Sequence, residues 1–458
     1  MVLVLTVVVL QSISFANYAL TTKTTNIIYG SAPYLTFDGG RTRITNTEAL
    51  LGISLSDGRT FTPTTNNSSS TNPIELPVAG QSFADIGMLV PTDTDSIALS
   101  SLIGTPYNYW GDDDGDGQGV NGVTATGSLN LSIVDRWNYR VARNQVLDIC
   151  NNDRGPYKLT LSNTSGTLKT RYGVPNESRF TAGRAIYYIN PKQTPVICYA
   201  IPNLEGRSGL SDAVWVSGGG YRPQSFTPSS YGLNFPTTGA NNLYFDLDIG
   251  GVSQALSWAP VSHGGITATM TDSTNTSVKV TLTGPVATES QWESDNPGRI
   301  DRISLPQVFE LVGRDSSGNA VVKYGFRLKQ WFVNRGSTNV SDPYSMESWC
   351  NKIGGYRVPK VKDLTNTRCA PDFEGCQSAT PTSSSILIYA RHIGAGFFTE
   401  WGDMRYYLGA NLDTHYYWTS NKTNRTSEGW APFYSISVDW GGINWLGSPN
   451  SSGVCVYP

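Results

Sequence analysis

The sequence SDPYSMESWCNKIGGYRVPKVKDLTNT, residues 341–367, decides the fold of the C-terminal part of this chain. Asp342 can accept a hydrogen bond from a free backbone N–H, and Pro343 suits the first position of a helix because its missing N–H has no partner there. Four apolar residues follow at helical spacing: Met346, Trp349, Cys350 and Ile353. The pattern predicts a short helix with one apolar face, which ends at Gly354-Gly355.

After this helix the spacing of apolar residues changes. A second short helix is expected where Val361 and Leu364 lie three apart, and FYSISVDW at 433–440 alternates as in a half-buried strand. A disulfide between Cys350 and Cys455 would tie the first helix to the last strand. In the chain-entropy model, closing a loop of about 100 residues contributes ~4.7 kcal/mol.

These features resemble the C-type-lectin-like domain at the tips of invasin and intimin adhesins. The resemblance rests on the WC helix end, the run GYRVPKVKDLTN (355–366), the YWTS strand (417–420) and the terminal cysteine strand. The wider chain resembles a family of enterobacterial surface adhesins described as a bacterial Ig-like domain of unknown function, on the runs DDDGD (112–116), SSYGLNFPTTGANNLYF (229–245), FELVGRDSSGN (309–319) and YGFRLKQWFVNRG (324–336). The resemblance implies adhesion as the function, and a mainly β fold in which Ig-like β-sandwich modules precede a small α+β C-type-lectin-like domain.

The composition agrees with a β-rich extracellular protein. The chain has 458 residues, enough for two to four domains, with 47 glycines and 11% aromatic residues. Charged residues make up 15% and the net charge is −3, whereas a nucleic-acid binder needs a clustered basic face. Nucleic acid is therefore not an expected partner.

Short strand-like runs cut by Gly, Pro and Asp, such as 49–55, 128–135 and 243–249, predict β-modules, as sandwiches or as barrels, and 321–333 predicts one long strand that leads into the tip domain. We expect residues 126–330 to form two modules that meet near 250–262. The expected segments are a signal peptide (1–16), an N-terminal β-rich module (17–125), the Ig-like region (126–330) and the lectin-like tip (331–458).

The N-terminus predicts export. Val2 to Leu10 is an apolar core of signal-peptide length, and Ser14-Phe15-Ala16 fits a small-x-small cleavage site, although no Lys or Arg precedes the core. A membrane anchor is the alternative, but spanning needs ~20 apolar residues. We expect a secreted or cell-surface location on the Gram-negative outer surface, no membrane span in the mature chain, and an outer-membrane partner if the chain is retained there.

Six cysteines allow 15 pairings. Sequence proximity favours Cys150–Cys198 and Cys369–Cys376, which leaves Cys350–Cys455. Six reduced thiols in a cytosolic protein are the alternative.

The acidic loop that begins at Asp112 has the first half of a calcium motif. Asp112, Asp114 and Asp116 occupy positions 1, 3 and 5, but position 12 is Val123, where an EF-hand has a bidentate Glu. Calcium is therefore a candidate ligand of a simpler loop between β-elements, and an exposed acidic turn is the alternative.

No pattern selects a catalytic site. The three histidines, His263, His392 and His415, stand outside any nucleophile, phosphate-loop or metalloprotease motif. No pair of carboxylates stands out for glycoside cleavage. We expect the chain not to be an enzyme, and a polysaccharide-active hydrolase is the less favoured alternative.

Aromatic residues of the tip are the candidate binding residues. Trp401 and Trp418 are assigned to the core, whereas Trp430, Trp440 and Trp445 lie in loop-like contexts and are candidates together with Phe433. The EPN, QPD and WND triplets of calcium-dependent sugar binders are absent, so a host or bacterial surface receptor, protein or glycan, is the expected partner. A carbohydrate-binding secreted protein and a scaffold without ligand are the alternatives.

Overall fold

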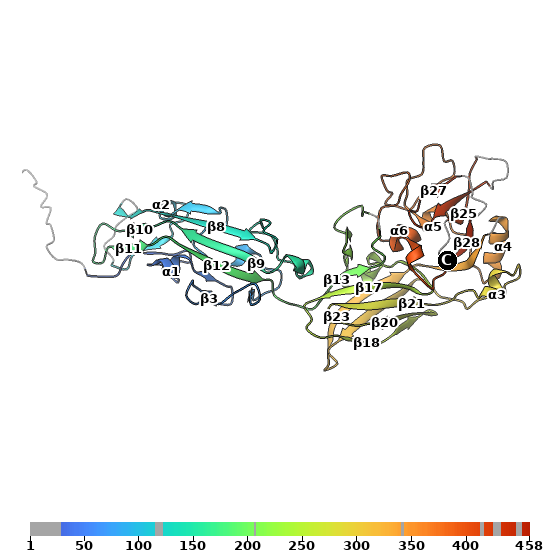
Figure 1. The fold of residues 1–458 in the computed structure, drawn as a ribbon, viewed down its shortest axis with the longest axis horizontal. Coiled ribbons are helices and arrows are strands. Elements are labelled where there is room, and N and C mark those ends of the chain that lie inside the picture. Colours follow the sequence, from blue (N-terminus) through green and yellow to red (C-terminus); the bar gives the residue numbers. More distant parts are fainter. Residues whose placement is uncertain are drawn as a thin grey trace, which may run out of the picture. The chain divides into compact units, whose positions relative to one another are not determined.

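The computed structural model describes residues 29–114, 122–205, 208–339, 343–412, 416–424, 432–445 and 451–458. The chain separates into two compact units (Figure 1). Unit 1 comprises Met1–Leu147 and Asp153–Asn190, and unit 2 comprises Asp148–Asn152 and Pro191–Pro458. Within the described ranges, no helix is long and apolar enough to cross a membrane.

Unit 1 is built on one five-stranded sheet with smaller strand pairs around it. The sheet has the order β4 (Ile74–Glu75), β12 (Gly183–Asn190), β9 (Tyr157–Asn163), β8 (Ser128–Val134) and β5 (Ser96–Ala98). A three-stranded sheet joins β11 (Glu177–Phe180), β10 (Gly166–Lys169) and β7 (Thr124–Ala125), and two pairs join β1 (Tyr34–Leu35) to β6 (Trp110–Gly111) and β2 (Ile53–Ser54) to β3 (Thr60–Phe61). The short helices are α1 (Thr47–Leu50), η1 (Phe83–Asp85), α2 (Leu99–Leu102) and η3 (Ile149–Arg154), of which η3 crosses the boundary between the units.

Unit 2 contains three larger sheets. The seven-stranded sheet has the order β14 (Trp215–Val216), β15 (Gly220–Tyr221), β13 (Val196–Ile201), β17 (Leu243–Gly250), β21 (Ser277–Thr283), β20 (Ile266–Thr271) and β19 (Val261–His263). A three-stranded sheet has the order β18 (Ser257–Trp258), β22 (Gln307–Arg314) and β23 (Ala320–Leu328). The six-stranded sheet has the order β16 (Thr238–Ala240), β24 (Gln330–Asn339), β28 (Ser452–Tyr457), β25 (Tyr416–Lys422), β26 (Phe433–Ser437) and β27 (Ile443–Asn444). The helices are η4 (Pro228–Leu233), α3 (Glu289–Trp292), α4 (Pro343–Lys352), α5 (Val361–Leu364), α6 (Phe397–Trp401) and η5 (Met404–Tyr406).

One aromatic-rich core joins these layers of unit 2. The ring of Phe245 on β17 lies 6.1 Å from that of Phe326 on β23, so the seven-stranded and three-stranded sheets face each other. The same ring lies 6.1 Å from Trp401 of α6. In Figure 1 the long strands β17, β20, β21 and β23 form one side of unit 2, and α5, α6, β25 and β27 form the other.

Alternating runs predict several long strands correctly. In β8, Leu129, Leu131 and Ile133 are buried while Asn130 and Ser132 are exposed, and β17 repeats this alternation. The predicted first helix is also confirmed as α4, which begins at Pro343 and buries the predicted apolar residues. The chain is mainly β, as expected.

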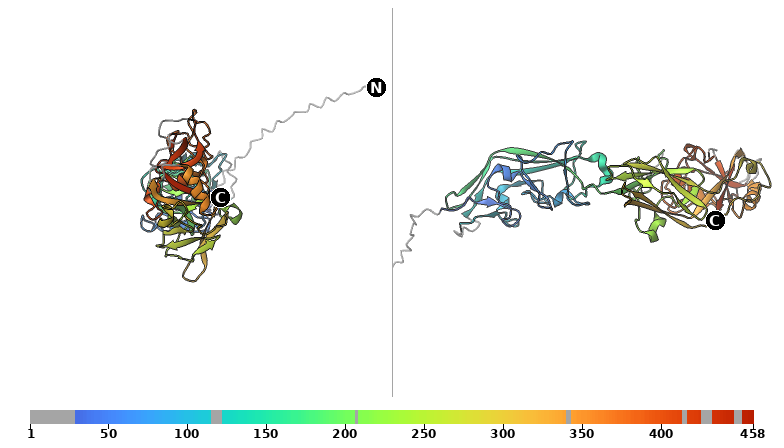
Figure 2. Two further views of the ribbon diagram at one scale, coloured as in Figure 1. Left: turned by 90° about the vertical axis from the view of Figure 1, so that its right-hand side faces the viewer. Right: turned by 90° about the horizontal axis from the view of Figure 1, so that it is seen from below.

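All six cysteines form disulfides, and the pairing is the expected one: Cys150–Cys198 and Cys369–Cys376, which proximity favours, and the remaining pair Cys350–Cys455. Cys350 lies on α4 and Cys455 on β28, which sits between β24 and β25 in the six-stranded sheet. The right-hand view of Figure 2 shows the carboxyl terminus, which follows β28, against the body of unit 2. This disulfide therefore fixes a helix to an interior strand.

Three local predictions are wrong. Residues 49–55 were expected as a strand, but Asn46 accepts the N–H of Ala49 and caps helix α1, so that only Ile53–Ser54 is a strand. The run 321–333 forms two strands, because the chain passes from the three-stranded to the six-stranded sheet at Lys329. Every residue of β26 is buried, so this strand is not half-exposed.

The compact units divide the chain at other places than the expected segments. The expected boundary at 125/126 lies within unit 1, where β5 pairs with β8, and the one near 250–262 lies within unit 2, where β17 pairs with β21. The expected boundary at 330/331 coincides with the passage between sheets, but one hydrophobic core continues across it. The expected signal peptide, 1–16, lies outside the described residues.

Candidate binding surface

The structure separates the four aromatic candidates. Trp430 lies outside the described residues. Phe433 is buried at the start of β26, Trp445 is partly buried against the core, and Trp440 is 43% exposed beyond the end of β26. Because β26 and β27 pair antiparallel, Trp445 lies towards the Phe433 end of the pair and Trp440 at the other end. Trp401 and Trp418 are buried, which confirms their assignment to the core.

Three consecutive aliphatic residues lie next to Trp440. Ile386, Leu387 and Ile388 are 40%, 70% and 37% exposed. A Cβ built on Gly442 would lie 2.7 Å from the carbonyl oxygen of Leu387 and 2.8 Å from the Trp440 ring, so the two segments meet at this glycine. We call Ile386, Leu387, Ile388 and Trp440 the apolar patch.

Serine side chains hold the loop that carries these aliphatic residues. The Ser385 hydroxyl accepts the N–H groups of Leu387 (3.0 Å) and Ile388 (3.2 Å). The Ser383 hydroxyl accepts the Ser385 N–H (3.1 Å) and donates to the Ile388 carbonyl (2.9 Å). These bonds satisfy the backbone within the loop, which leaves the aliphatic side chains to point outward.

The buried amide of Asn366 joins the two ends of this loop. Its Nδ2 donates to the carbonyls of Pro381 (3.0 Å) and Ala390 (2.9 Å), and its Oδ1 accepts the Ala390 N–H (3.1 Å). Its backbone carbonyl accepts the N–H of Ser383 (2.8 Å). Asn366 is fully buried, so it acts on the loop's geometry and not on a ligand.

Trp440 is held by the turn between β26 and β27. The N–H of Gly441 donates to Ser437 (2.9 Å), and the Trp440 carbonyl accepts the N–H of Tyr389 (3.0 Å). Gly441 has φ +63°, and a Cβ there would lie 2.5 Å from the Tyr389 ring. Glycine is therefore required at 441 by both conformation and space.

An ion-paired arginine borders the apolar patch. The Arg405 guanidinium lies 2.7 Å from Asp403 and 3.3 Å from Asp439, the residue before Trp440. Hydrogen bonding to Asp403 raises the pKa of Arg405 above its ordinary value. The charged groups at the edge of the patch are therefore already paired with one another.

A second group of polar residues is buried beneath, in and around α6. Glu400 accepts hydrogen bonds from five donors: the N–H and hydroxyl groups of Thr237 and Thr238 and the Gly394 N–H. Burial raises the pKa of Glu400, and these donors oppose that rise. The Arg391 guanidinium donates to the Glu400 carbonyl (2.8 Å). These bonds connect α6 to β16.

The acidic loop is described only as far as Asp114, so Asp116 lies outside the described residues. The Asp114 carboxylate accepts the N–H of Ser31 (2.7 Å), and the intervening Asp113 pairs with Arg43. In the described part of the chain, no group of three or more His, Cys, Asp or Glu residues is arranged to hold a metal ion. Calcium binding by Asp112, Asp114 and Asp116 stays a prediction.

The described histidines do not form a catalytic arrangement with a nucleophile. His263 is exposed on β19 beside the ring of Phe309, and His392 Nδ1 lies 2.8 Å from the Ile393 carbonyl. His415 lies outside the described residues.

Sequence reasoning selected Trp440 and missed the three aliphatic residues and Asn366. SSSILIY at 383–389 reads as the start of a buried strand, because consecutive aliphatic residues have that pattern. The three serines before ILI are the available signal, since Ser side chains bond to nearby backbone in turns.

No protein-family model matches the chain, and no curated protein matches it. Among solved structures, invasin, a bacterial integrin-binding protein, is 14% identical over 75% of this chain and 53% of its own, with a TM-score of 0.34. The C-terminal 282-residue fragment of intimin, solved with the translocated intimin receptor domain, is 10% identical over 73% and 93%, with a TM-score of 0.28. SGBP-B of the Bacteroides ovatus mixed-linkage glucan utilization locus, solved with a mixed-linkage heptasaccharide, is 10% identical over 46% of this chain and 63% of its own, with a TM-score of 0.15. The chain thus spans about half of the invasin chain, and TM-scores this low do not establish a shared fold or function.

Proposed function

We propose that this protein is a bacterial cell-surface or secreted adhesin, and that unit 2 binds a protein receptor on a host or neighbouring cell through the apolar patch. The exposed aliphatic loop beside Trp440 carries this proposal. Large apolar side chains gathered on a surface are typical of interaction sites. At protein interfaces, most of the affinity comes from a few such anchors that lose water on binding.

The rigidity of the loop favours recognition. Binding usually costs conformational entropy in the groups that become ordered, and a loop already fixed by Ser383, Ser385 and Asn366 loses less of it. Leu387, at 70% exposure, is the side chain that a partner pocket would cover most.

The cysteines support an extracellular location. Three disulfides with no cysteine left over are characteristic of proteins that fold in an oxidising compartment. The motifs that resemble invasin and intimin tips fall on α4, α5, β25 and β28, so we assign a C-type-lectin-like role to this C-terminal region and an Ig-like role to the sheets before it. The lectin triplets are missing, which favours a protein receptor over a calcium-bound sugar.

Cell binding tests the proposal. The full chain, labelled and with its disulfides intact, is titrated onto epithelial cells and onto bacteria, and bound protein is measured by flow cytometry. We expect saturable binding that Leu387→Asp and Trp440→Ala each weaken by about tenfold or more, since losing one interface anchor costs ~2 kcal/mol.

The matched control is Leu233→Asp, the same change at a leucine that is 58% exposed on η4. It should bind as the unchanged protein does. Equal loss in the control, or no saturable binding to any cell, would overturn the proposal. Cells treated with protease should lose binding and cells treated with glycosidases should keep it; the reverse result would establish the carbohydrate-binding alternative.

A further inference from the structure

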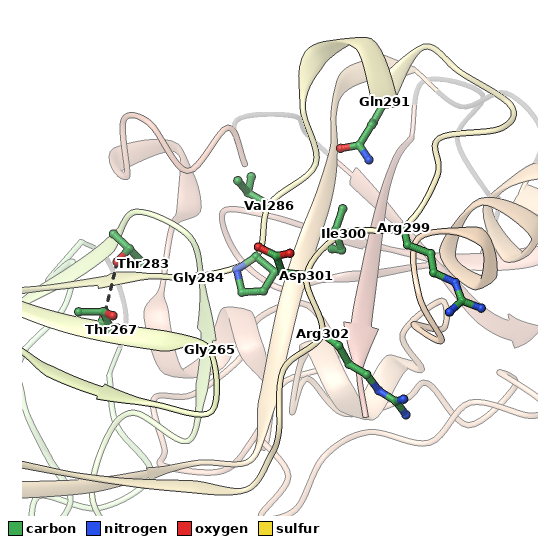
Figure 3. A pocket seen from close by; sticks show the side chains of 11 residues that line it. Gly265, Thr267, Thr283, Gly284, Val286, Gln291, Arg299, Ile300, Asp301 and Arg302 are labelled. Carbon is green, nitrogen blue, oxygen red and sulfur yellow. Dashed lines mark hydrogen bonds between the residues drawn. The ribbon is translucent and has the colours of Figure 1, made fainter.

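A concave site lies on unit 2, between the ends of β20 and β21 and the segment 285–302 that follows β21. Its volume is about 740 Å³, within the range of small-molecule pockets. Figure 3 shows the residues that line it: Gly265, Thr267, Thr283, Gly284, Pro285, Val286, Gln291, Arg299, Ile300, Asp301 and Arg302. None of them belongs to the apolar patch.

One wall of this pocket is fixed against a buried tryptophan. The Trp331 Nε1 donates to the Pro285 carbonyl (2.9 Å), and the Gly284 N–H donates to Asn241 (3.1 Å). A Cβ on Gly284 would lie 2.7 Å from the Trp331 ring, so the chain passes directly against the indole. The wall therefore cannot move inward to fill the pocket.

Hydrogen bonds also hold the opposite wall. The Gln291 amide donates to the Pro297 carbonyl (2.9 Å), and the Ile300 N–H donates to the Ile353 carbonyl at the end of α4 (3.0 Å). The pocket is thus preformed between two backbone segments, which lowers the ordering cost of binding.

Two arginines give the pocket its charge. Arg299 and Arg302 are exposed, and neither forms an ion pair or hydrogen bond with the described residues. In Figure 3 both side chains extend to the same side of the segment, while Asp301 between them points the other way, to the side on which Gly284 is labelled. A guanidinium carries donors in a planar fork that fits carboxylate or sulfate groups, and two of them together make a site for a ligand with repeated anionic groups.

The remaining lining favours a ligand rich in hydroxyl groups. Thr267, Thr283 and Gln291 offer hydroxyl and amide groups, Asp301 offers a carboxylate acceptor, and Gly265 and Gly284 expose backbone. The aliphatic residues of the lining are Pro285, Val286 and Ile300, too few to receive the side chains of a bound peptide.

We propose that this pocket binds an anionic saccharide. Arg299 and Arg302 bind its carboxylate or sulfate groups, and Asp301, Thr267 and Thr283 bind its hydroxyls. The inference stands apart from the proposed receptor binding, since it uses different residues and a different part of unit 2.

Calorimetric titration of the full, disulfide-bonded chain tests it. The probes are a heparin octasaccharide (sulfated), a hyaluronan octasaccharide (carboxylated), a dextran oligosaccharide (neutral) and hexaglutamate (an acidic peptide). We expect one or both anionic saccharides to bind and dextran and hexaglutamate not to bind, and the first two arms identify which anionic group is recognised. Arg299→Gln with Arg302→Gln should weaken binding at least tenfold, because both charge-assisted contacts to the anionic groups of the ligand are lost.

Two comparisons keep the result specific. The control double variant Arg327→Gln with Arg368→Gln makes the same charge change at exposed arginines outside the pocket and should bind normally. Val286→Trp, a substitution at a side chain that is 43% exposed, should block the pocket without disturbing the core. No saccharide binding, tighter binding of hexaglutamate, or an equal loss in the control variant would each overturn the proposal.

Discussion

The five-stranded sheet of unit 1 and the six-stranded sheet of unit 2 are built on opposite plans. In β8 of the first sheet, apolar residues alternate with exposed polar ones, so one face meets water. In β26 of the second sheet every residue is buried, including Ser435 and Ser437, and all three disulfides belong to unit 2. In unit 2, buried polar groups and disulfides hold irregular loops in place, and these loops carry the apolar patch. Unit 1 has the simpler construction of a sheet with one wet face.

Removing the disulfide between α4 and β28 should lower the stability of unit 2 more than any other change proposed here. Cys350→Ser with Cys455→Ser opens a loop of 105 residues, and we expect the free energy of unfolding of unit 2 to fall by ~4–5 kcal/mol. The loss should appear in urea unfolding followed by tryptophan fluorescence, because residues 191–458 contain ten of the twelve tryptophans. Unit 1 should keep its own transition by hydrogen exchange.

The short disulfide is the control for that experiment. Cys369→Ser with Cys376→Ser opens a loop with a sequence separation of 7, for which the same model gives ~2 kcal/mol. If both double variants lose the same stability, loop closure does not explain how unit 2 is stabilised.

Matched serines test whether the two sheets differ in burial. Ser435→Asp would place a charge inside the covered sheet, and we expect unit 2 to lose ~3 kcal/mol or more. Ser132→Asp on the exposed face of β8 should change unit 1 by no more than ~0.5 kcal/mol. Both values come from urea unfolding, with hydrogen exchange to assign each loss to its unit. A tolerated Ser435→Asp would mean that β26 has a solvated face.

Asn366 tests whether the enclosed polar groups serve the loop. Asn366→Ala leaves the Pro381 and Ala390 carbonyls without their donor, and we expect a loss of ~2 kcal/mol with faster hydrogen exchange across 381–390. Receptor binding should weaken although Asn366 is buried away from any partner. Asn130→Ala, on the exposed face of β8, is the control and should cost less than ~0.5 kcal/mol. Unchanged exchange in 381–390 would show that the serines alone hold the loop.

Local sequence signals predicted part of the fold, and contacts between distant residues determine the part that was missed. Period-two alternation is a local signal and identified β8 and β17. Proximity identified Cys150–Cys198 and Cys369–Cys376, which left Cys350–Cys455 as the remaining pair. The passage of the chain between sheets at Lys329 is not local: its N–H donates to the Thr237 carbonyl (2.7 Å), almost a hundred residues earlier. A single strand was therefore predicted where two exist.

The candidate site was predicted only in part for the same reason. Trp440 follows a strand and precedes two glycines, which marks a turn, and it is exposed. Ile386, Leu387 and Ile388 lie in a loop whose two ends are hydrogen-bonded to Asn366, about 20 residues earlier in the DLTN run. No local sequence pattern marks a buried amide that makes such bonds. Burial of β26 on both faces likewise comes from α4, α5 and the loops that cover it.

Acid should produce the smallest difference between the units, and it tests one buried carboxylate. Burial would raise the pKa of Asp363, but hydrogen bonds from Arg357 (2.5 Å), the Lys360 N–H (2.8 Å) and Gln330 (3.2 Å) outweigh it and lower the pKa below the ordinary 3.8. A carboxyl group whose pKa is lower in the folded than in the unfolded chain stabilises the fold at pH values above its unfolded pKa. This stability is lost as the pH falls through the folded pKa. We therefore expect unit 2 to lose stability as the pH falls below about 3.8, and Asp363→Asn to lack that part of the slope when urea midpoints are measured by tryptophan fluorescence from pH 6 to pH 2.

Asp57→Asn in unit 1 is the control, because its carboxylate, bonded to Arg59, is exposed and its interaction is screened by salt. Parallel slopes in the unchanged protein and in Asp363→Asn would show that other carboxylates control the acid stability of unit 2.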